Sequence, residues 1–275
     1  MFEVLNDRSV LEVSGPDSFK FLQNLITNDI AKNNYCYSYI LSNQGKYLFD
    51  FFVFKDSNER FLIDINKNEL SLFKNKLLLY KLRANVTFMD LDDYSIIYSP
   101  AALDFPSLIS TRDPRCNLLG FRSIVAQDIT RSTAQDLYIK DKYNLAITDG
   151  YIDLIYDRSI PLEYGAEELV GISYTKGCYV GQEVMSRTKY QGVIRKKIFH
   201  LSSDSDLSNL SKNDEINIDN VAIGIICSAH QNNAIGLIRE EKYLALHNKE
   251  VNMDKAIIKL SIPQWRAMPP VGQIR

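Results

Sequence analysis

Alternating side chains on either side of a glycine turn place the strongest constraint on how this 275-residue chain can fold. The alternating residues are Tyr37, Tyr39 and Leu41 before the turn, and Tyr47, Phe49, Phe51 and Val53 after it. Alternation with a period of two is typical of strands that bury one face, and Gly45 can supply the positive φ that such a turn needs. The sequence therefore predicts a β-hairpin over residues 35–54.

The rest of the N-terminal region mixes helical and strand patterns. Further elements are expected as a hairpin over 2–13, helices at 16–28 and 68–81, and strands at 60–65, 85–90 and 94–98. Residues 100–130 contain three prolines and are predicted to be irregular. A helix near 132–142, short strands up to about 160 and a helix at 182–190 follow. The fold class expected from these patterns is α+β.

The pattern changes after Val193, where short β-rich segments dominate. They cover 194–201, 215–219, 221–228, 234–238, 243–246 and 256–262, with Asn, Asp, Ser and Gly between them. Such spacing is typical of a small β-sandwich or β-barrel. We therefore expect two domains, at residues 1–194 and 195–275.

Composition argues against several classes of function. The formal net charge is −2, and the basic cluster between Arg187 and Lys197 is short, so direct binding of nucleic acid is not expected. No signal peptide and no apolar stretch long enough for a membrane span is found, so we expect a cytoplasmic protein. The four cysteines are far apart and no pair has CxxC spacing, so no metal site is expected.

One segment concentrates residues that carry chemistry: Lys176-Gly177-Cys178-Tyr179-Val180-Gly181-Gln182-Glu183. Two glycines around Cys178 allow unusual backbone angles and the close approach of a ligand. If a helix begins near Gln182, its N-terminus and Lys176 would favour the reactive thiolate form of Cys178. The alternative that the residues leave open is an inert cysteine buried in a glycine-rich turn.

This octapeptide resembles the signature of the YgfZ proteins and of their mitochondrial relatives in iron–sulfur cluster maturation. Further similarity to that family runs along most of the chain. It covers Val13–Asp17, Phe21–Gln23, Thr27–Asp29, Leu41–Val53, Tyr80–Val86, Pro161–Glu163 and Tyr190–Lys197. YgfZ proteins belong to the aminomethyltransferase superfamily, which includes the glycine-cleavage T-protein.

The resemblance implies a fold, a cofactor and a role. The fold would be a T-protein-like folate-binding core with a ferredoxin-like insert and a C-terminal β-barrel, in a ring-like arrangement with tetrahydrofolate in the central hole. The role would be that of an accessory factor for iron–sulfur cluster assembly or repair, serving [4Fe–4S] enzymes and radical enzymes that modify tRNA. A monomer is expected, located in the mitochondrial matrix if the chain is eukaryotic, with iron–sulfur client or assembly proteins as partners.

The resemblance also implies roles for individual residues. Cys178 would be a reactive thiol or a transient cluster or persulfide contact, and Lys176 would favour its thiolate. Asp50 would meet the reduced pterin or its one-carbon end, and Arg187 the folate glutamate. The full set of expected folate-site residues is Asn28, Asp29, Asp50, Arg83, Glu163, Gln182, Glu183 and Arg187.

Two other functions remain open. In true aminomethyltransferases two adjacent acids follow the hairpin glycines, whereas here Phe49 precedes Asp50. A Glu-Ala-Gly segment that helps to hold the pterin in T-proteins has its nearest counterpart in Thr148-Asp149-Gly150. A tetrahydrofolate-dependent aminomethyltransferase is therefore the alternative to an accessory factor, and a tRNA-binding module over Arg187–Lys197 is the third.

Overall fold

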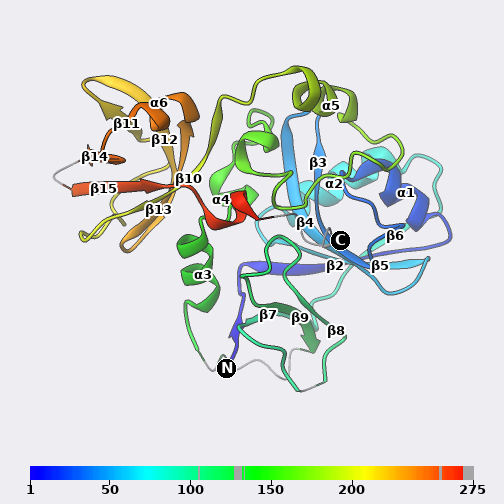
Figure 1. Ribbon diagram of the computed structural model, residues 1–275. Coiled ribbons are helices and arrows are strands. Elements are labelled where there is room, and N and C mark those ends of the chain that lie inside the picture. The colour runs from blue at the N-terminus through cyan, green and yellow to red at the C-terminus, as the bar shows by residue number, and fades with distance from the viewer. Residues whose placement is uncertain (105, 127–131, 133, 254–255, 269–275) are drawn as a thin grey trace.

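The computed structural model describes residues 1–104, 106–126, 132, 134–253 and 256–268. Within these residues, three antiparallel sheets and their helices pack around a shared centre (Figure 1). The first sheet lies on the right of that view, the second lies at the bottom, and the C-terminal sheet lies on the left. A core cluster of buried side chains joins residues from all three parts.

The first sheet has the strand order β3-β4-β5-β2-β6. Its strands are β2 (Arg8–Ser14), β3 (Tyr35–Leu41), β4 (Tyr47–Lys55), β5 (Arg60–Asn66) and β6 (Thr87–Asp90). Two helices, α1 (Ser18–Leu25) and α2 (Leu70–Lys81), pack on one face through apolar residues such as Leu22 and Phe73. The opposite face points toward the centre of the molecule.

A β-bulge in β4 decides which residues face that centre. Ile40 pairs with Phe49 and Leu41 pairs with Tyr47, so Leu48 is the extra residue. Beyond the bulge, Phe52 and Phe54 face the central cluster, whereas Phe51 and Val53 face the helices. The bulge turns Tyr47 onto the central face, although simple alternation would put it beside Phe49. Asp50 alternates with Phe51, so it lies on the central face as well.

The second sheet has the order β1-β7-β9-β8, with β1 (Glu3–Val4), β7 (Tyr94–Ser99), β8 (Ile109–Arg112) and β9 (Phe121–Ala126). Helix α3 (Leu137–Leu145), helix α4 (Gly150–Asp153) and the 3-10 turn η2 (Pro161–Tyr164) lead from it to α5 (Gln182–Gln191). Because β1 belongs to the second sheet and β2 to the first, the strands of these two sheets are interleaved along the chain.

The C-terminal sheet has the order β11-β12-β13-β10-β15-β14. Its elements are β10 (Lys196–Ser202), β11 (Glu215–Ile218), β12 (Val221–His230), β13 (Asn233–Arg239), α6 (Glu240–Ala245), β14 (Glu250–Met253) and β15 (Ala256–Ser261). The edge strands β11 and β14 approach each other, so the sheet forms a nearly closed barrel. A barrel leaves few unpaired strand edges.

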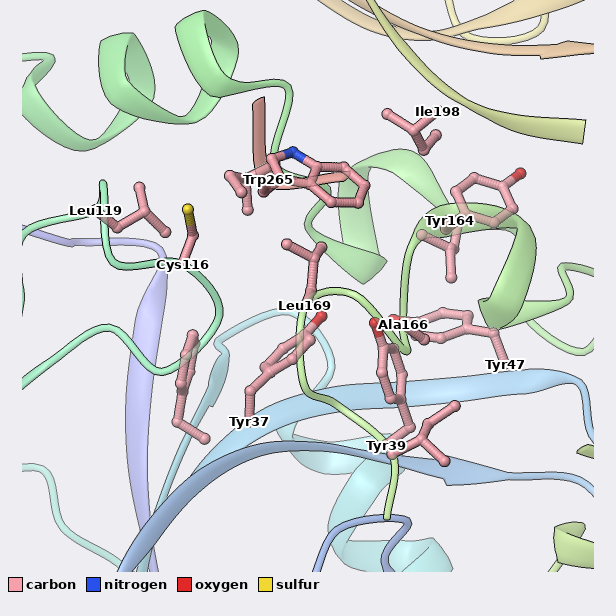
Figure 2. Close-up of a cluster of buried hydrophobic side chains, with 14 of the residues drawn as sticks. Tyr37, Tyr39, Tyr47, Cys116, Leu119, Tyr164, Ala166, Leu169, Ile198 and Trp265 are labelled. Carbon is pink, nitrogen blue, oxygen red and sulfur yellow. The ribbon is translucent and has the colours of Figure 1, made fainter. Parts of the chain in front are cut away.

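After the barrel, the 3-10 turn η3 (Gln264–Ala267) returns to the centre and places Trp265 there. Figure 2 shows its ring above Leu169 and Tyr37. Trp265 is 3% exposed, and its indole Nε1 donates a hydrogen bond to the carbonyl of Leu145 at 2.8 Å. Its ring also lies against Gly165, where an added Cβ would come within 2.4 Å of it. Trp265 therefore fastens the C-terminal segment to the core.

Several expected elements differ from the structure. The predicted hairpin over 2–13 is wrong, because β1 pairs with β7 and β2 with β5. Residues 100–130 contain β8 and β9, and residues 146–160 contain α4 in place of short strands. The strand expected at 243–246 is helix α6, whose first turn carries Glu240 and Glu241. The helix expected near 132–142 begins at Leu137, and residue 133 lies outside the described residues.

We expect Trp265→Ala to lower the free energy of unfolding by about 3–5 kcal/mol, the usual loss when a large aromatic side chain is removed from a core. Urea denaturation followed by circular dichroism measures it. Leu79→Ala is the control, because Leu79 is 72% exposed and its loss should change stability by less than about 0.5 kcal/mol. Equal effects of the two substitutions would contradict the fastening role of Trp265.

Candidate functional site

The octapeptide forms the loop that leads into α5 and packs on the turn of the β3–β4 hairpin. Gly181 precedes the helix with a φ of +83°. A Cβ at Gly181 would come within 2.7 Å of the Ser42 carbonyl, and one at Gly45 would come within 3.3 Å of Val184. Glycine is therefore needed where loop and hairpin turn meet.

Lys176 anchors this loop to the end of α1. Its ammonium Nζ donates to the carbonyls of Ile26 at 2.6 Å and Asn28 at 2.7 Å, and it lies 5.3 Å from the centre of the Tyr179 ring. Ile26 is the C-cap of α1, where a cation is favourable. Burial lowers the pKa of Lys176 to about 8, although the Asp29 carboxylate acts in the opposite direction. The positive end of Lys176 thus binds backbone carbonyls.

Cys178 is exposed, whereas the other three cysteines are buried. Burial raises the pKa of Cys36 to about 12 and raises the pKa of Cys116 and Cys227 as well. The open alternative of an inert, buried Cys178 is therefore wrong on the point of burial. A Cβ added at Gly177 would have no atom within 4 Å, so the loop beside the thiol is open to a partner.

Asn28 and Asp29 use their polar atoms within the fold. The amide nitrogen of Asn28 donates to the carbonyls of Tyr37 at 2.7 Å and Val170 at 2.6 Å. One oxygen of Asp29 accepts from Gln23 at 2.9 Å and from the amide of Ala31 at 3.0 Å. Both residues therefore position the segment to which Lys176 is anchored.

Asp50 lies on the central face of the first sheet and is 4% exposed. Its Oδ2 accepts a hydrogen bond from the Tyr37 hydroxyl at 2.8 Å, and its Oδ1 accepts one from the Tyr47 hydroxyl at 3.1 Å. Burial raises the pKa of Asp50, and the charge of Arg8 acts in the opposite direction. Gly150 lies so close that an added Cβ would be 2.0 Å from Oδ1. The Thr148–Gly150 segment therefore packs directly against the carboxyl of Asp50, the residue that the family resemblance indicates.

A second carboxyl, Glu69, stands next to Asp50 and was not anticipated from the sequence. Its Oε1 lies 3.1 Å from the same Tyr47 hydroxyl, and burial raises its pKa to about 8. Glu69 precedes α2, 19 positions after Asp50, and no local pattern links it to that strand. The sequence offers one signal for Glu69, an acidic residue at the start of a predicted helix. That signal does not indicate which residue Glu69 contacts.

The remaining expected folate-site residues lie apart from Asp50. Arg83, Glu183 and Arg187 are exposed, and Gln182 is partly exposed in the first turn of α5. Glu163 is partly exposed in η2, where burial raises its pKa against the charges of Lys196 and Lys46. Gln182, Glu183 and Arg187 thus lie on α5, the helix that follows Cys178 in the chain, whereas Asp50 lies in strand β4.

The basic cluster between Arg187 and Lys197 is partly neutralised. Lys189 forms an ion pair with Glu167, and its amine lies 3.8 Å from the centre of the Tyr174 ring. Lys197 pairs with Glu240 at 3.0 Å. Within the described ranges, no three His, Cys, Asp or Glu side chains gather closely enough to hold a metal ion, and no helix is long and apolar enough to cross a membrane.

Comparisons with known proteins relate the chain to iron–sulfur assembly factors. A family model described as the CAF17 C-terminal beta-barrel domain matches residues 195–268. The mitochondrial iron-sulfur cluster assembly factor IBA57 homolog of Pyricularia oryzae is 32% identical over 217 residues, which are 72% of this chain and 56% of that protein. The chain thus spans little more than half of this fungal relative. Human IBA57 is 27% identical over 298 residues, 95% of this chain and 84% of the human protein.

A solved structure with the same fold is the glycine cleavage system aminomethyltransferase T from Bartonella henselae. The TM-score is 0.70 at 15% identity, and the match covers 95% of this chain and 85% of the other. The predicted fold class, a T-protein-like core with a C-terminal β-barrel, is confirmed. The names of the IBA57 relatives place them in mitochondria, in agreement with a matrix location if the chain is eukaryotic. The narrower YgfZ assignment stays a prediction.

We expect Lys176→Met to loosen the loop that carries Cys178. Hydrogen bonds from a charged donor are worth about 1.5–3 kcal/mol, so amide exchange in residues 173–181 should become roughly ten- to a hundredfold faster. Hydrogen exchange followed by mass spectrometry measures this change. Lys32→Met is the control, because the Lys32 amine is exposed and donates a single hydrogen bond to the same loop among the described residues, to the Thr175 hydroxyl at 3.2 Å. Unchanged exchange in Lys176→Met would refute the anchor.

Proposed function

We propose that this chain is a tetrahydrofolate-binding accessory factor for iron–sulfur cluster assembly or repair, supporting [4Fe–4S] enzymes and radical enzymes that modify tRNA. The observation that carries the proposal is the exposed Cys178 on an anchored loop, in a chain whose relatives are named iron-sulfur cluster assembly factors. The proposal includes a monomer that divides into residues 1–194 and 195–275.

The role of the thiol follows from its surroundings. An exposed cysteine beside a glycine and a helix N-terminus can meet a partner that brings a cluster or a persulfide. One thiol cannot hold a cluster alone, so ligation needs donors from a client protein, a second chain or glutathione. Lys176 and Asn28 contribute by holding the loop in place.

Asp50 and its neighbours suit the edge of a reduced pterin. A pterin offers N–H donors and ring acceptors, and Asp50 with Tyr37 and Tyr47 offers a carboxylate and two hydroxyls. The nearby Tyr39 hydroxyl is buried without a partner among the described residues, with its ring centroid 5.1 Å from that of Tyr37. A ligand at Asp50 would replace one of the tyrosine hydroxyls from which the carboxyl now accepts. Bound tetrahydrofolate would supply a one-carbon carrier at this face.

The other expected folate contacts extend the same proposal toward the surface. Arg83 and Arg187 are exposed cations suited to the carboxylates of a folate glutamate tail. Glu163, Gln182 and Glu183 would complete the entrance with polar atoms. Asn28 and Asp29 would act indirectly, by positioning the loop.

The thiol is tested by complementation in a strain that lacks the native gene. We expect Cys178→Ala to lose most of the restored activity of a [4Fe–4S] enzyme, since it removes the accessible sulfur but keeps the loop. Thr175→Ala, an exposed position on the same loop, should restore activity like the wild type. Full restoration by Cys178→Ala would exclude the thiol from the function.

The folate site is tested by calorimetric titration with tetrahydrofolate. We expect binding by the wild type, at least tenfold weaker binding by Asp50→Asn because a charged hydrogen-bond acceptor is worth about 1.5–3 kcal/mol, and unchanged binding by Cys178→Ala. Absence of binding by the wild type would overturn the folate part of the proposal. Equal loss in both variants would show that the thiol and the pocket form one site.

A further inference from the structure

Two buried carboxyls share one tyrosine hydroxyl. The oxygen of Tyr47 lies 3.1 Å from Asp50 Oδ1 and 3.1 Å from Glu69 Oε1. Tyr47 is 1% exposed, Asp50 4% and Glu69 8%, so water solvates these contacts little. The bulge at Leu48 creates this arrangement by turning Tyr47 to the face of Asp50.

The number of protons available limits what this geometry allows. Each contact of 3.1 Å between oxygens needs one proton, and the Tyr47 hydroxyl carries one. If both carboxyls were ionised, one contact would set lone pairs against lone pairs in a buried site, which is costly. A single additional proton on either carboxyl completes both hydrogen bonds.

The neighbours of each carboxyl decide where that proton resides. Asp50 accepts a second hydrogen bond from Tyr37, and Arg8 favours its charge, although Asp149 opposes it. The Oε2 atom of Glu69, in contrast, is buried and has no hydrogen-bond partner among the described residues. The proton is therefore more stable on Glu69, and the negative charge is more stable on Asp50.

The charged groups around Glu69 come from several elements. Burial is the largest influence and raises its pKa to about 8, and the negative charge of Asp50 acts in the same direction. Arg8 from β2 and Lys212 from the loop before β11 lower it, but the Lys212 amine is also bound to the Leu154 carbonyl at 2.7 Å. The raised pKa brings the titration of Glu69 closer to neutral pH than that of an ordinary glutamate.

The three residues also connect two regions of the molecule. Asp50 lies on the central face of the first sheet, whereas Glu69 lies at the start of α2. The exposed fraction is 8% for Glu69, 4% for Asp50 and 1% for Tyr47. Glu69 is thus the member of the group nearest to solvent.

We propose that Asp50, Tyr47 and Glu69 form a relay that carries one proton between solvent near α2 and the central face of the first sheet. The Glu69 proton moves to the Tyr47 oxygen as the Tyr47 proton moves to Asp50, and Asp50 then gives a proton to an acceptor bound beside it. Glu69 is left as a carboxylate and regains a proton from water; no electrons are transferred. Its use on a pterin nitrogen rests on the proposed folate site.

The relay has a direct test that needs no ligand. Glu69→Gln keeps the shape of the side chain and removes the titrating proton. Because the folded chain holds this proton more tightly than the unfolded chain, its contribution to stability is complete below the ordinary glutamate pKa and is lost as pH rises to about 8. From pH 5 to 8 we expect the folding equilibrium constant of the wild type to fall more than tenfold relative to Glu69→Gln, since one unit of pKa shift is a factor of ten.

Urea denaturation over this pH range measures the effect, and NMR of carboxyl-labelled glutamate follows Glu69 itself. Glu59→Gln is the control at an exposed turn position, and its stability should depend on pH in the same way as that of the wild type. Tyr47→Phe keeps the ring and removes the bridge, so the titration of Glu69 should respond less to Asp50→Asn than it does in the wild type, because only the charge of Asp50 then acts on it. Parallel pH curves for wild type and Glu69→Gln, or a Glu69 that titrates like a free glutamate, would overturn the relay.

Calorimetry with tetrahydrofolate in buffers of different ionisation enthalpy separates the relay from the folate site. If the wild type takes up or releases protons on binding tetrahydrofolate and Glu69→Gln does not, the result supports both the relay and the folate site. Binding with identical proton exchange in the two proteins overturns the use of the relay by folate. If tetrahydrofolate does not bind, the folate site fails, and the denaturation and NMR results still decide whether the relay exists.

Discussion

One additional residue in strand β4 determines what the centre of this molecule contains. The bulge at Leu48 turns Tyr47 inward while Phe49 and Phe51 stay against the helices. Without it, Tyr47 would face α2 and Asp50 would lose one of its two tyrosine donors. Tyr37, Tyr39 and Tyr47 then form the surface of the sheet against which Trp265 and the segment after α4 pack (Figure 2). The buried carboxyls and the apolar core therefore depend on one backbone irregularity.

The hairpin turn links this centre to the thiol loop. Gly45 lies against Val184 of α5, and Asp50 follows Gly45 by five positions, about 16 Å along an extended chain. Cys178 lies beyond that turn on a loop tied to α1 by Lys176. The α5 segment that follows the thiol loop thus packs at the turn of one strand pair, and the buried carboxyls lie toward the middle of its second strand. The proposed function uses both places, with a small molecule at the buried carboxyls and a partner protein at the exposed thiol.

Local patterns predicted the elements better than their partners. Period-two alternation and Gly45 predict the β3–β4 hairpin, because both signals lie within adjacent strands. The same reasoning paired residues 2–5 with 8–13, whereas β1 joins β7 over 90 positions away. Nothing local encodes that choice, because the free energy of pairing depends on the whole sheet. The strand expected at 243–246 was wrong for a related reason: short apolar runs fit either helix or strand.

The candidate site was only partly predictable. Resemblance picked out Asp50, and the Asp50 carboxyl does face the centre. The same resemblance indicates Cys178 as a functional residue, whereas spacing alone is also compatible with an inert, buried cysteine. Lys176 was expected to act on the thiol, and its ammonium binds two carbonyls. Glu69 was missed, because only the folded chain brings a helix start to the middle of β4.

A crystal structure of the chain with bound tetrahydrofolate would test most directly whether the buried carboxyls receive a small molecule while the thiol stays outside. We expect the pterin within hydrogen-bond distance of the Asp50 carboxyl, with the Tyr37 hydroxyl displaced, the Tyr47 hydroxyl still bound to Asp50 and Cys178 still exposed on its loop. A pterin bound elsewhere, for example in the groove of about 350 Å³ between α1, Tyr80 and Val180, would refute this arrangement.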